Sequence, residues 1–132
     1  MIVVDSSVWI AFFRGIDRRS GTHLQRLLDR DQVALPIFVR LELLSGVKGY
    51  EIVKLRRLLS ALPTRYPSEV NWMAVEEWVE TGSRVGQRFG IGDLVIAAAA
   101  AQWDEPIWSL DSDFGRMAKL GWIRLYRPDL AG

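Results

Sequence analysis

Short apolar runs alternate along the chain with longer segments in which apolar residues recur every three or four positions. The short runs, rich in β-branched residues, predict buried strands at 2–5, 32–35, 64–66, 106–110 and 122–126. The periodic segments predict helices at about 8–13, 23–31, 37–44, 50–62, 68–89, 94–103 and 114–120, with a polar loop over 16–22. Strands that alternate with helices favour an α/β domain, spanning 1–132, whose parallel sheet is covered on both faces.

The segment from Leu94 to Ala101 contains no polar residue, so we expect that helix to be buried on all sides. Asp93 comes directly before it, in a turn that carries Gly90 and Gly92. Taken alone, Asp93 fits the role of a helix N-cap, which Asp favours. The alternative is a charge held at the mouth of the core.

Three further acids occupy comparable places. Asp5 and Asp111 each follow a predicted strand, and Glu42 lies in the helix that follows the second strand. Glu42 sits among apolar residues, where an unpaired Glu is almost never buried, so pairing with Arg40 is its structural alternative. Asp111 and Asp113 also fit turn and cap positions. Because open parallel sheets bind ligands outside the carboxyl ends of their strands, we expect these acids to meet at one edge.

Carboxylates at close range repel one another, so such a cluster requires cations. The chain has no Cys and a single His, His23, which lies in a polar stretch and is expected at the surface. Oxygen ligands alone favour Mg²⁺ or Mn²⁺. Two such ions orient a phosphodiester and activate water, so the predicted chemistry is metal-dependent phosphodiester hydrolysis without a histidine pair.

Composition and charge narrow the setting. Hydrophobic residues make up 49% of the chain and charged residues 25%, as in globular proteins. Neither a span of about 18 apolar residues nor a signal peptide is evident, so we expect a cytoplasmic protein without a membrane segment. The net charge of +1 divides into a basic first half and an acidic second half. Candidates for contacting the phosphates of a substrate are Arg14, Arg18, Arg19 and Arg40.

Apolar residues are also in surplus around Trp9, Phe12, Phe13 and the 50–62 helix. Such a surplus is consistent with a groove for a partner helix, and equally with ordinary core.

Four stretches around these acids resemble the acidic motifs of PIN-domain nucleases. They are Val4-Asp-Ser-Ser-Val-Trp-Ile10, Arg40-Leu-Glu-Leu-Leu-Ser-Gly46, Gly92-Asp-Leu-Val-Ile-Ala-Ala98 and Leu110-Asp-Ser-Asp-Phe114. Size and spacing are similar to those of VapC toxins from toxin–antitoxin pairs. The resemblance implies a three-layer α/β/α sandwich with a five-stranded parallel sheet. It also implies Mg²⁺- or Mn²⁺-dependent endoribonuclease activity on RNA, a homodimer, and neutralisation by a VapB-type antitoxin.

Carried over by position, the resemblance implies catalytic, metal-binding roles for Asp5, Glu42 and Asp93. The fourth acid is Asp111, with Asp113 as the second choice and a further metal ligand. Ser7 matches a supporting hydroxyl that follows the first acid, and Ser7 and Ser109 either hydrogen-bond the acids or only cap helices.

Two other function classes compete with the nuclease. A PIN-like module that binds RNA or a protein without cutting would be marked by a lost acid, and none is lost here. Phosphoryl transfer on an aspartate superficially fits Asp111-Ser-Asp113, but that motif normally opens its fold, and here only about 20 residues follow it.

Overall fold

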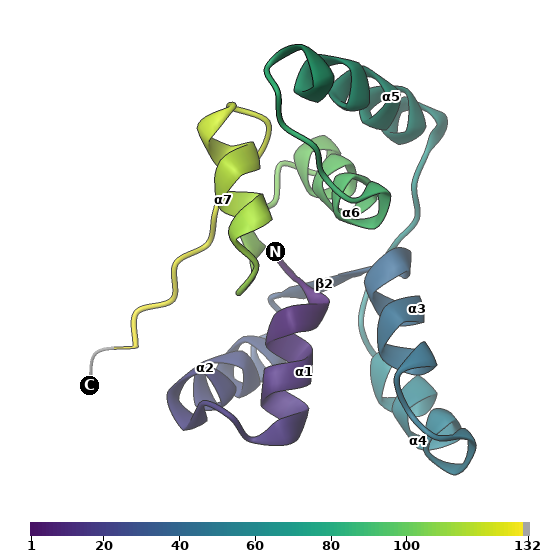
Figure 1. Cartoon of the computed structure of the whole chain (residues 1–132). Coiled ribbons are helices and arrows are strands. Elements are labelled where there is room, and N and C mark those ends of the chain that lie inside the picture. Colours follow the sequence, from purple (N-terminus) through teal and green to yellow (C-terminus); the bar gives the residue numbers. More distant parts are fainter. Residues whose placement is uncertain (131–132) are drawn as a thin grey trace.

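The computed structural model describes residues 1–130, in which strands and helices alternate (Figure 1). The strands are β1 (Ile2–Val4), β2 (Val33–Pro36), β3 (Thr64–Arg65) and β4 (Ile107–Trp108). The helices are α1 (Ser6–Arg14), α2 (Arg18–Asp29), α3 (Ile37–Ser45), α4 (Gly49–Leu59), α5 (Glu69–Arg84), α6 (Ile91–Gln102) and α7 (Ser112–Lys119). Over 1–130, none of the helices has both the length and the apolarity that crossing a bilayer requires.

The strands form one parallel sheet in the order β3-β2-β1-β4. β1 is central, because Val3 pairs with Ala34 of β2 on one side and with Ile107 of β4 on the other. In Figure 1 the strands lie in the middle, with α1 and α2 below them and α5, α6 and α7 above. The predicted α/β class with a parallel sheet is therefore confirmed.

The prediction of a fifth strand is wrong for the described residues. Residues 122–126 contribute a single parallel bridge between Leu125 and Ile107. Ile107 N donates to Arg124 O at 2.9 Å, and Tyr126 N donates to Ile107 O at 2.7 Å. Because β4 has only two residues, the segment has few backbone groups with which to pair, and no longer strand forms. Since the bridge is parallel, Tyr126 still follows the strands toward their carboxyl edge.

Side-chain caps move several helix starts from the predicted positions. α2 begins at Arg18 rather than at His23, because Asp17 accepts from Arg19 N at 3.1 Å and from the Ser20 hydroxyl at 2.8 Å. The expected loop over 16–22 is thus mostly helix. In α1 the cap is Asp5, whose carboxylate accepts from Ser7 N, so Ser6 and Ser7 are already helical.

The helix end predicted at Phe89 comes earlier, at Arg84. Gly86 has a φ of +73°, and a Cβ on Gly82 would lie 2.6 Å from Gln87 O, so the chain turns back across the end of α5. α6 largely has the predicted character: of the run from Leu94 to Ala101, every residue up to Ala100 is buried and Ala101 is exposed. Helix α6 therefore passes through the core, with its first turn at the carboxyl edge of the sheet.

Candidate metal and catalytic site

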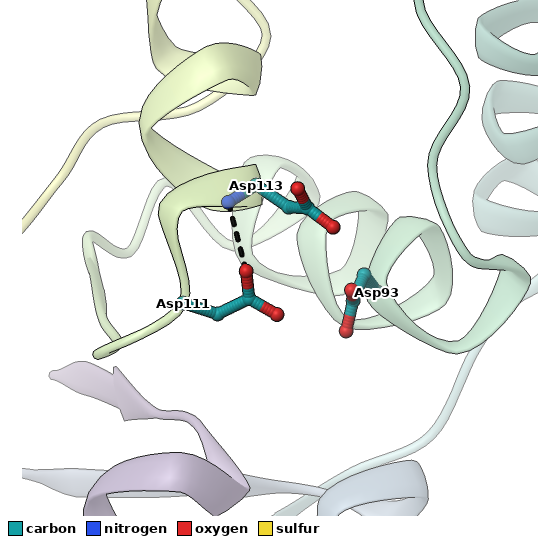
Figure 2. A group of neighbouring side chains, drawn as sticks. All are labelled: Asp93, Asp111 and Asp113. Carbon is teal, nitrogen blue, oxygen red and sulfur yellow. Dashed lines mark hydrogen bonds between the residues drawn. The ribbon is translucent and has the colours of Figure 1, made fainter.

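Three aspartates from two helices form an acid centre, which we define as Asp93, Asp111 and Asp113. Each offers one carboxylate oxygen, and these oxygens lie within 4.8 Å of one another. Figure 2 shows Asp93 on the first turn of α6, facing Asp111 and Asp113 at the start of α7. Asp111 is exposed and the other two are half-buried, so the centre is open to a ligand from solvent.

The first turn of α7 brings Asp111 and Asp113 together. Asp111 is the N-cap and accepts a hydrogen bond from Asp113 N at 2.9 Å. Of the two alternatives that the sequence left open, Asp111 is therefore the cap, yet the same carboxylate also belongs to the acid centre. An Asp at the N-terminus of a helix is favoured by the unpaired N–H groups there.

Arg116 holds Asp113 in place. Its Nη2 donates to Asp113 Oδ1 at 2.7 Å, and the guanidinium also reaches Gln87 Oε1 and Arg88 O at 3.4 and 3.3 Å. The guanidinium carbon lies 4.4 Å from the centroid of the Phe89 ring. This arginine ties α7 to the segment that leads into α6. Sequence reasoning missed it, although its position three residues after Asp113 is a usual spacing for helical ion pairs.

Asp5 follows β1 and is buried, with 3% of its surface exposed. Its Oδ2 accepts from the Ser7 hydroxyl at 2.7 Å and from the Ser109 hydroxyl at 2.8 Å. Ser7 Oγ accepts in turn from Leu110 N at 3.0 Å. Both serines therefore contact the acid, which resolves the alternative of mere capping. These bonds join the carboxyl ends of β1 and β4 and fix the orientation of the Asp5 carboxylate.

Glu42 lies on α3 and differs from expectation, because it is exposed rather than enclosed by its apolar neighbours. The suggested pairing with Arg40 is absent among residues 1–130: Arg40 Nη2 donates to Ser60 Oγ at 3.3 Å instead. Partial desolvation raises the pKa of Glu42, the charge of Asp5 raises it further, and a hydrogen bond from Ser6 opposes both. Glu42 thus faces the acidic edge without a cationic partner.

Asp93 is not the N-cap of α6. Gly90 has that place, and Asp93 is the third helical residue with no side-chain capping bond. The pKa of Asp93 is raised to about 6, chiefly by desolvation and then by the charges of Asp5, Asp111, Asp113 and Glu42, in that order of size. The other four predicted acids are therefore all close enough to repel Asp93. A cation among them would relieve this repulsion.

A close packing of α3 on α6 sets this arrangement. A Cβ on Gly92 would overlap the ring of Phe38, so only glycine lets α3 approach the first turn of α6. Phe38 and Glu42 lie one turn apart on α3, and Gly92 and Asp93 are adjacent on α6. The contact between the Phe38 ring and Gly92 therefore helps to set how near Glu42 and Asp93 lie.

The arginines proposed for RNA phosphates are spread over the surface. Arg14 ends α1, and Arg18 and Arg19 open α2, all three exposed. Arg40 is half-buried on α3. Among the described residues none of the four is paired with an acid of the candidate site, where the one ion pair belongs to Arg116.

Comparisons with known proteins agree with this geometry. A family model described as PIN domain matches residues 2–120. Ribonuclease VapC11 of Mycobacterium tuberculosis is 27% identical over 125 residues, which cover 91% of this chain and 93% of that protein. Ribonuclease VapC10 of the same species is 29% identical over 111 residues, covering 84% and 83%.

The fold also has solved neighbours. One is VapBC2 from Rickettsia felis, solved bound to a DNA fragment from its promoter. Its matching chain is 21% identical and superposes with a TM-score of 0.78, covering 98% of this chain and all of that one. At this level of identity the likeness describes the fold alone.

Proposed function

The chain belongs to the PIN domain family, and from this premise we propose that it is a metal-dependent endoribonuclease toxin, neutralised by a VapB-type antitoxin. The observation that carries the proposal is the acid centre, with Asp5 and Glu42 beside it. Supporting it, the curated relatives with matching length are named ribonucleases. The place of action we propose is the cytoplasm.

The donor set of the acid centre fits Mg²⁺ or Mn²⁺. Carboxylate oxygens are the ligands that these ions prefer, and the three aspartates bring one oxygen each within 4.8 Å. We assign the binding of the cation to Asp93, Asp111 and Asp113, with Asp5 and Glu42 completing the site. When bound, the cation supplies Lewis-acid activation of the phosphodiester and of water.

The remaining residues position these ligands. Ser7 and Ser109 orient Asp5 through Oδ2. Arg116 orients Asp113 and balances part of the negative charge. With a pKa of about 6, Asp93 is mostly ionised at pH 7, so it is available to a cation, and at pH 5 a proton occupies it instead.

The first experiment is cleavage of total cellular RNA by the purified, antitoxin-free chain with Mg²⁺, with Mn²⁺ and with EDTA. Asp93→Asn keeps the shape of the side chain and removes its charge, and we expect cleavage to fall about 100-fold or more, because several kcal/mol of charge stabilisation is lost. Asp29→Asn, at the exposed end of α2, is the matched control and should cut normally.

The results of this cleavage experiment distinguish a nuclease site from a non-catalytic binding site. Discrete fragments that require metal and disappear in Asp93→Asn support the nuclease, and mapping their ends identifies the RNA. Cleavage undiminished in Asp93→Asn would refute the site assignment. RNA bound but never cut by the folded chain would favour a non-catalytic binding module.

For the antitoxin we propose the groove between α1 and α4, a hollow of about 440 Å³ lined by Phe13, Val47, Glu51, Lys54, Leu55 and Leu58. Phe13 and Leu58 are 45% and 54% exposed, and an apolar groove of this kind suits an amphipathic partner helix. The solved neighbour from Rickettsia felis is a VapBC assembly, which supports a partner of this class.

Co-expression with the cognate antitoxin tests this placement. Leu58→Asp should abolish co-purification of the antitoxin and leave RNA cleavage intact. Val70→Asp on α5, where the parent side chain is 63% exposed, is the control and should retain the antitoxin. Capture that survives Leu58→Asp would rule the groove out. The proposed homodimer is checked on the same preparations by light scattering after gel filtration.

A further inference from the structure

A basic hollow lies beside α2 and shares no residue with the acid centre. It has a volume of about 200 Å³ and is lined by Arg18, Arg19, Thr22, His23, Arg26, Asp129 and Leu130. We call it the α2 hollow. Three guanidinium groups and one carboxylate face it, so its lining carries a net positive charge. The first two arginines belong to the first turn of α2, where the helix dipole adds to the attraction for anions.

None of these three arginines forms an ion pair within residues 1–130, although the charge of Arg19 is one of the causes that lower the pKa of Asp17. By contrast, Arg65, Arg84, Arg116 and Arg124 each form an ion pair. Asp17, the cap of α2, bonds to Arg19 N and to the Ser20 hydroxyl rather than to a guanidinium. Thr22 donates to Arg18 O at 2.9 Å, so its hydroxyl proton is already used. The guanidinium groups are the donors that remain, and their forked geometry matches phosphate oxygens.

His23 fixes the wall of the hollow and relates it to the candidate active site. Its Nε2 lies 2.6 Å from the Tyr126 hydroxyl, and its ring stacks on Tyr126 at 5.8 Å between centroids. The His23 ring also meets Trp108 edge-on at 5.5 Å. Trp108 directly precedes Ser109, which donates to Asp5. The surface position expected for His23 is thus wrong. The side chain is half-buried and joins α2 to Trp108 of β4 and to Tyr126.

The chain direction places the hollow beside the carboxyl edge of the sheet. Leu125 pairs in parallel with Ile107, so Tyr126 and the residues after it leave the sheet at the same edge as Ser109. The hollow is therefore lined in part by the segment that leaves the sheet at the carboxyl edge, where the acids lie. A polyanion drawn across this edge would meet positive charge at α2 and carboxylates at the acid centre.

We propose that the α2 hollow binds a phosphodiester of the RNA strand at a nucleotide away from the one that is cut. This deepens the proposed function and rests on it for the identity of the ligand. The hollow holds the strand through Arg18, Arg19 and Arg26, and the acid centre acts on another phosphate of the same strand. The hollow contributes to substrate affinity and leaves the chemical step unchanged.

The test is binding of fluorescent single-stranded RNA, followed by anisotropy at several salt concentrations, in the cleavage-deficient Asp93→Asn chain. In that background, the double variant Arg18→Gln/Arg26→Gln should bind about 10-fold more weakly. Two lost phosphate contacts should reduce the slope of log K against log salt by about 1.4. The matched control is Arg30→Gln/Arg57→Gln, which removes two exposed arginines outside the hollow and tests for a general charge effect.

Cleavage kinetics supply an independent readout in the chain with Asp93 intact. Arg18→Gln/Arg26→Gln should raise KM about 10-fold with kcat unchanged. Competition with inorganic phosphate distinguishes a contact to the RNA strand from a site for a free anion. Millimolar phosphate should weaken RNA binding by the parent chain no more than chloride does at the same ionic strength. Stronger competition by phosphate would mean a site for a free anion and would overturn the strand proposal.

Failure of this proposal is distinguishable from failure of the nuclease assignment. Equal affinity and slope in the double variant and its control would overturn the hollow while leaving metal-dependent cleavage untouched. Weaker RNA binding by the double variant in a chain that never cuts would retain the hollow and remove the nuclease. Thermal unfolding should be the same for both double variants, since all four side chains are exposed.

Discussion

The acids at the two edges of the sheet differ in how their charge is balanced. At the amino edge, Glu105 lies before β4 with 7% of its surface exposed and accepts two bonds from Arg65, each at 3.1 Å. Arg65 is covered in turn by the ring of Trp103, 4.2 Å from its guanidinium carbon. At the carboxyl edge five acids lie together, and within residues 1–130 only Asp113 forms an ion pair, with Arg116.

This difference in charge balance indicates which acids stabilise the fold and which are available to a ligand. A buried carboxylate that serves the fold is matched by a fixed counter-charge, because an unpaired charge is costly. At the carboxyl edge the acids repel one another, and all of them except the buried Asp5 are half-buried or exposed. An arrangement that costs stability without a ligand is typical of a site built for a cation.

The largest effect on stability is expected from breaking the neutralised edge. Glu105→Gln leaves Arg65 without its counter-charge, and we expect the free energy of unfolding to fall by about 3 kcal/mol. Chemical denaturation measures it. The contrasting variant is Asp93→Asn, which removes one of the repelling charges and should not lower stability in EDTA. Equal losses in the two variants would contradict the comparison.

The acidic edge should gain stability from the ion it is proposed to bind. At a cation concentration about 100 times the dissociation constant, Mg²⁺ or Mn²⁺ should stabilise the parent chain by about 2.7 kcal/mol. Differential scanning fluorimetry across a metal titration would report this as a rising midpoint. Asp93→Asn should show a much smaller shift, whereas Glu105→Gln should show the full one.

The spacing of the acids should depend on the contact between Gly92 and Phe38 rather than on counter-charges. Gly92→Ala forces a methyl group into the Phe38 ring, and overpacking of this kind costs about 2 kcal/mol. Gly115→Ala in α7, where a Cβ would meet nothing within 4 Å, is the control and should be neutral or slightly stabilising. Unfolding midpoints together with RNA cleavage rates would measure both effects.

The smallest effect is a pH dependence specific to the acidic edge. The pKa of Asp93 is raised from 3.8 to about 6 in the folded chain, so folding is favoured while Asp93 is protonated. That contribution is present below about pH 4 and is lost as the pH rises through about 6. Since Asp93 is only half-buried, we expect a loss of about 1 kcal/mol.

Unfolding in EDTA at pH 4 and at pH 7 tests this prediction. The stability of Asp93→Asn relative to the parent chain should increase by that amount between the two pH values. A difference that is independent of pH, or that shrinks toward pH 7, would contradict the repulsion argument.

Much of the fold could be predicted from local pattern. The apolar run from Leu94 to Ala101 predicted a helix buried on all sides, and in α6 the whole run except Ala101 is buried. The β-branched run before Asp5 predicted a buried strand, and this strand is β1, which lies at the centre of the sheet. A buried helix and a buried strand depend mainly on the residues next to one another along the chain, and the sequence gives these directly. The start of α2 was misplaced because its cap, Asp17, precedes a polar stretch without an apolar pattern.

The acids of the candidate site were all named from the sequence, and their catalytic roles stay predictions. What local pattern did not reveal is how each one is held. The exposure of Glu42, the pairing of Asp113 with Arg116 and the place of His23 between Trp108 and Tyr126 came only with the structure. Each depends on which faces of distant elements meet.

The sequence by itself determined the kinds of element, their order, and the positions of carboxylates after strands and at helix starts. Hydrophobic periodicity and capping preferences act over a few residues, so they can be read along the chain. The tertiary structure decided that Asp93 faces Asp111 and Asp113, that Gly92 admits Phe38, and that the last segment forms only a bridge. These follow from packing between elements far apart in sequence, whose free energy depends on the shape of the whole core.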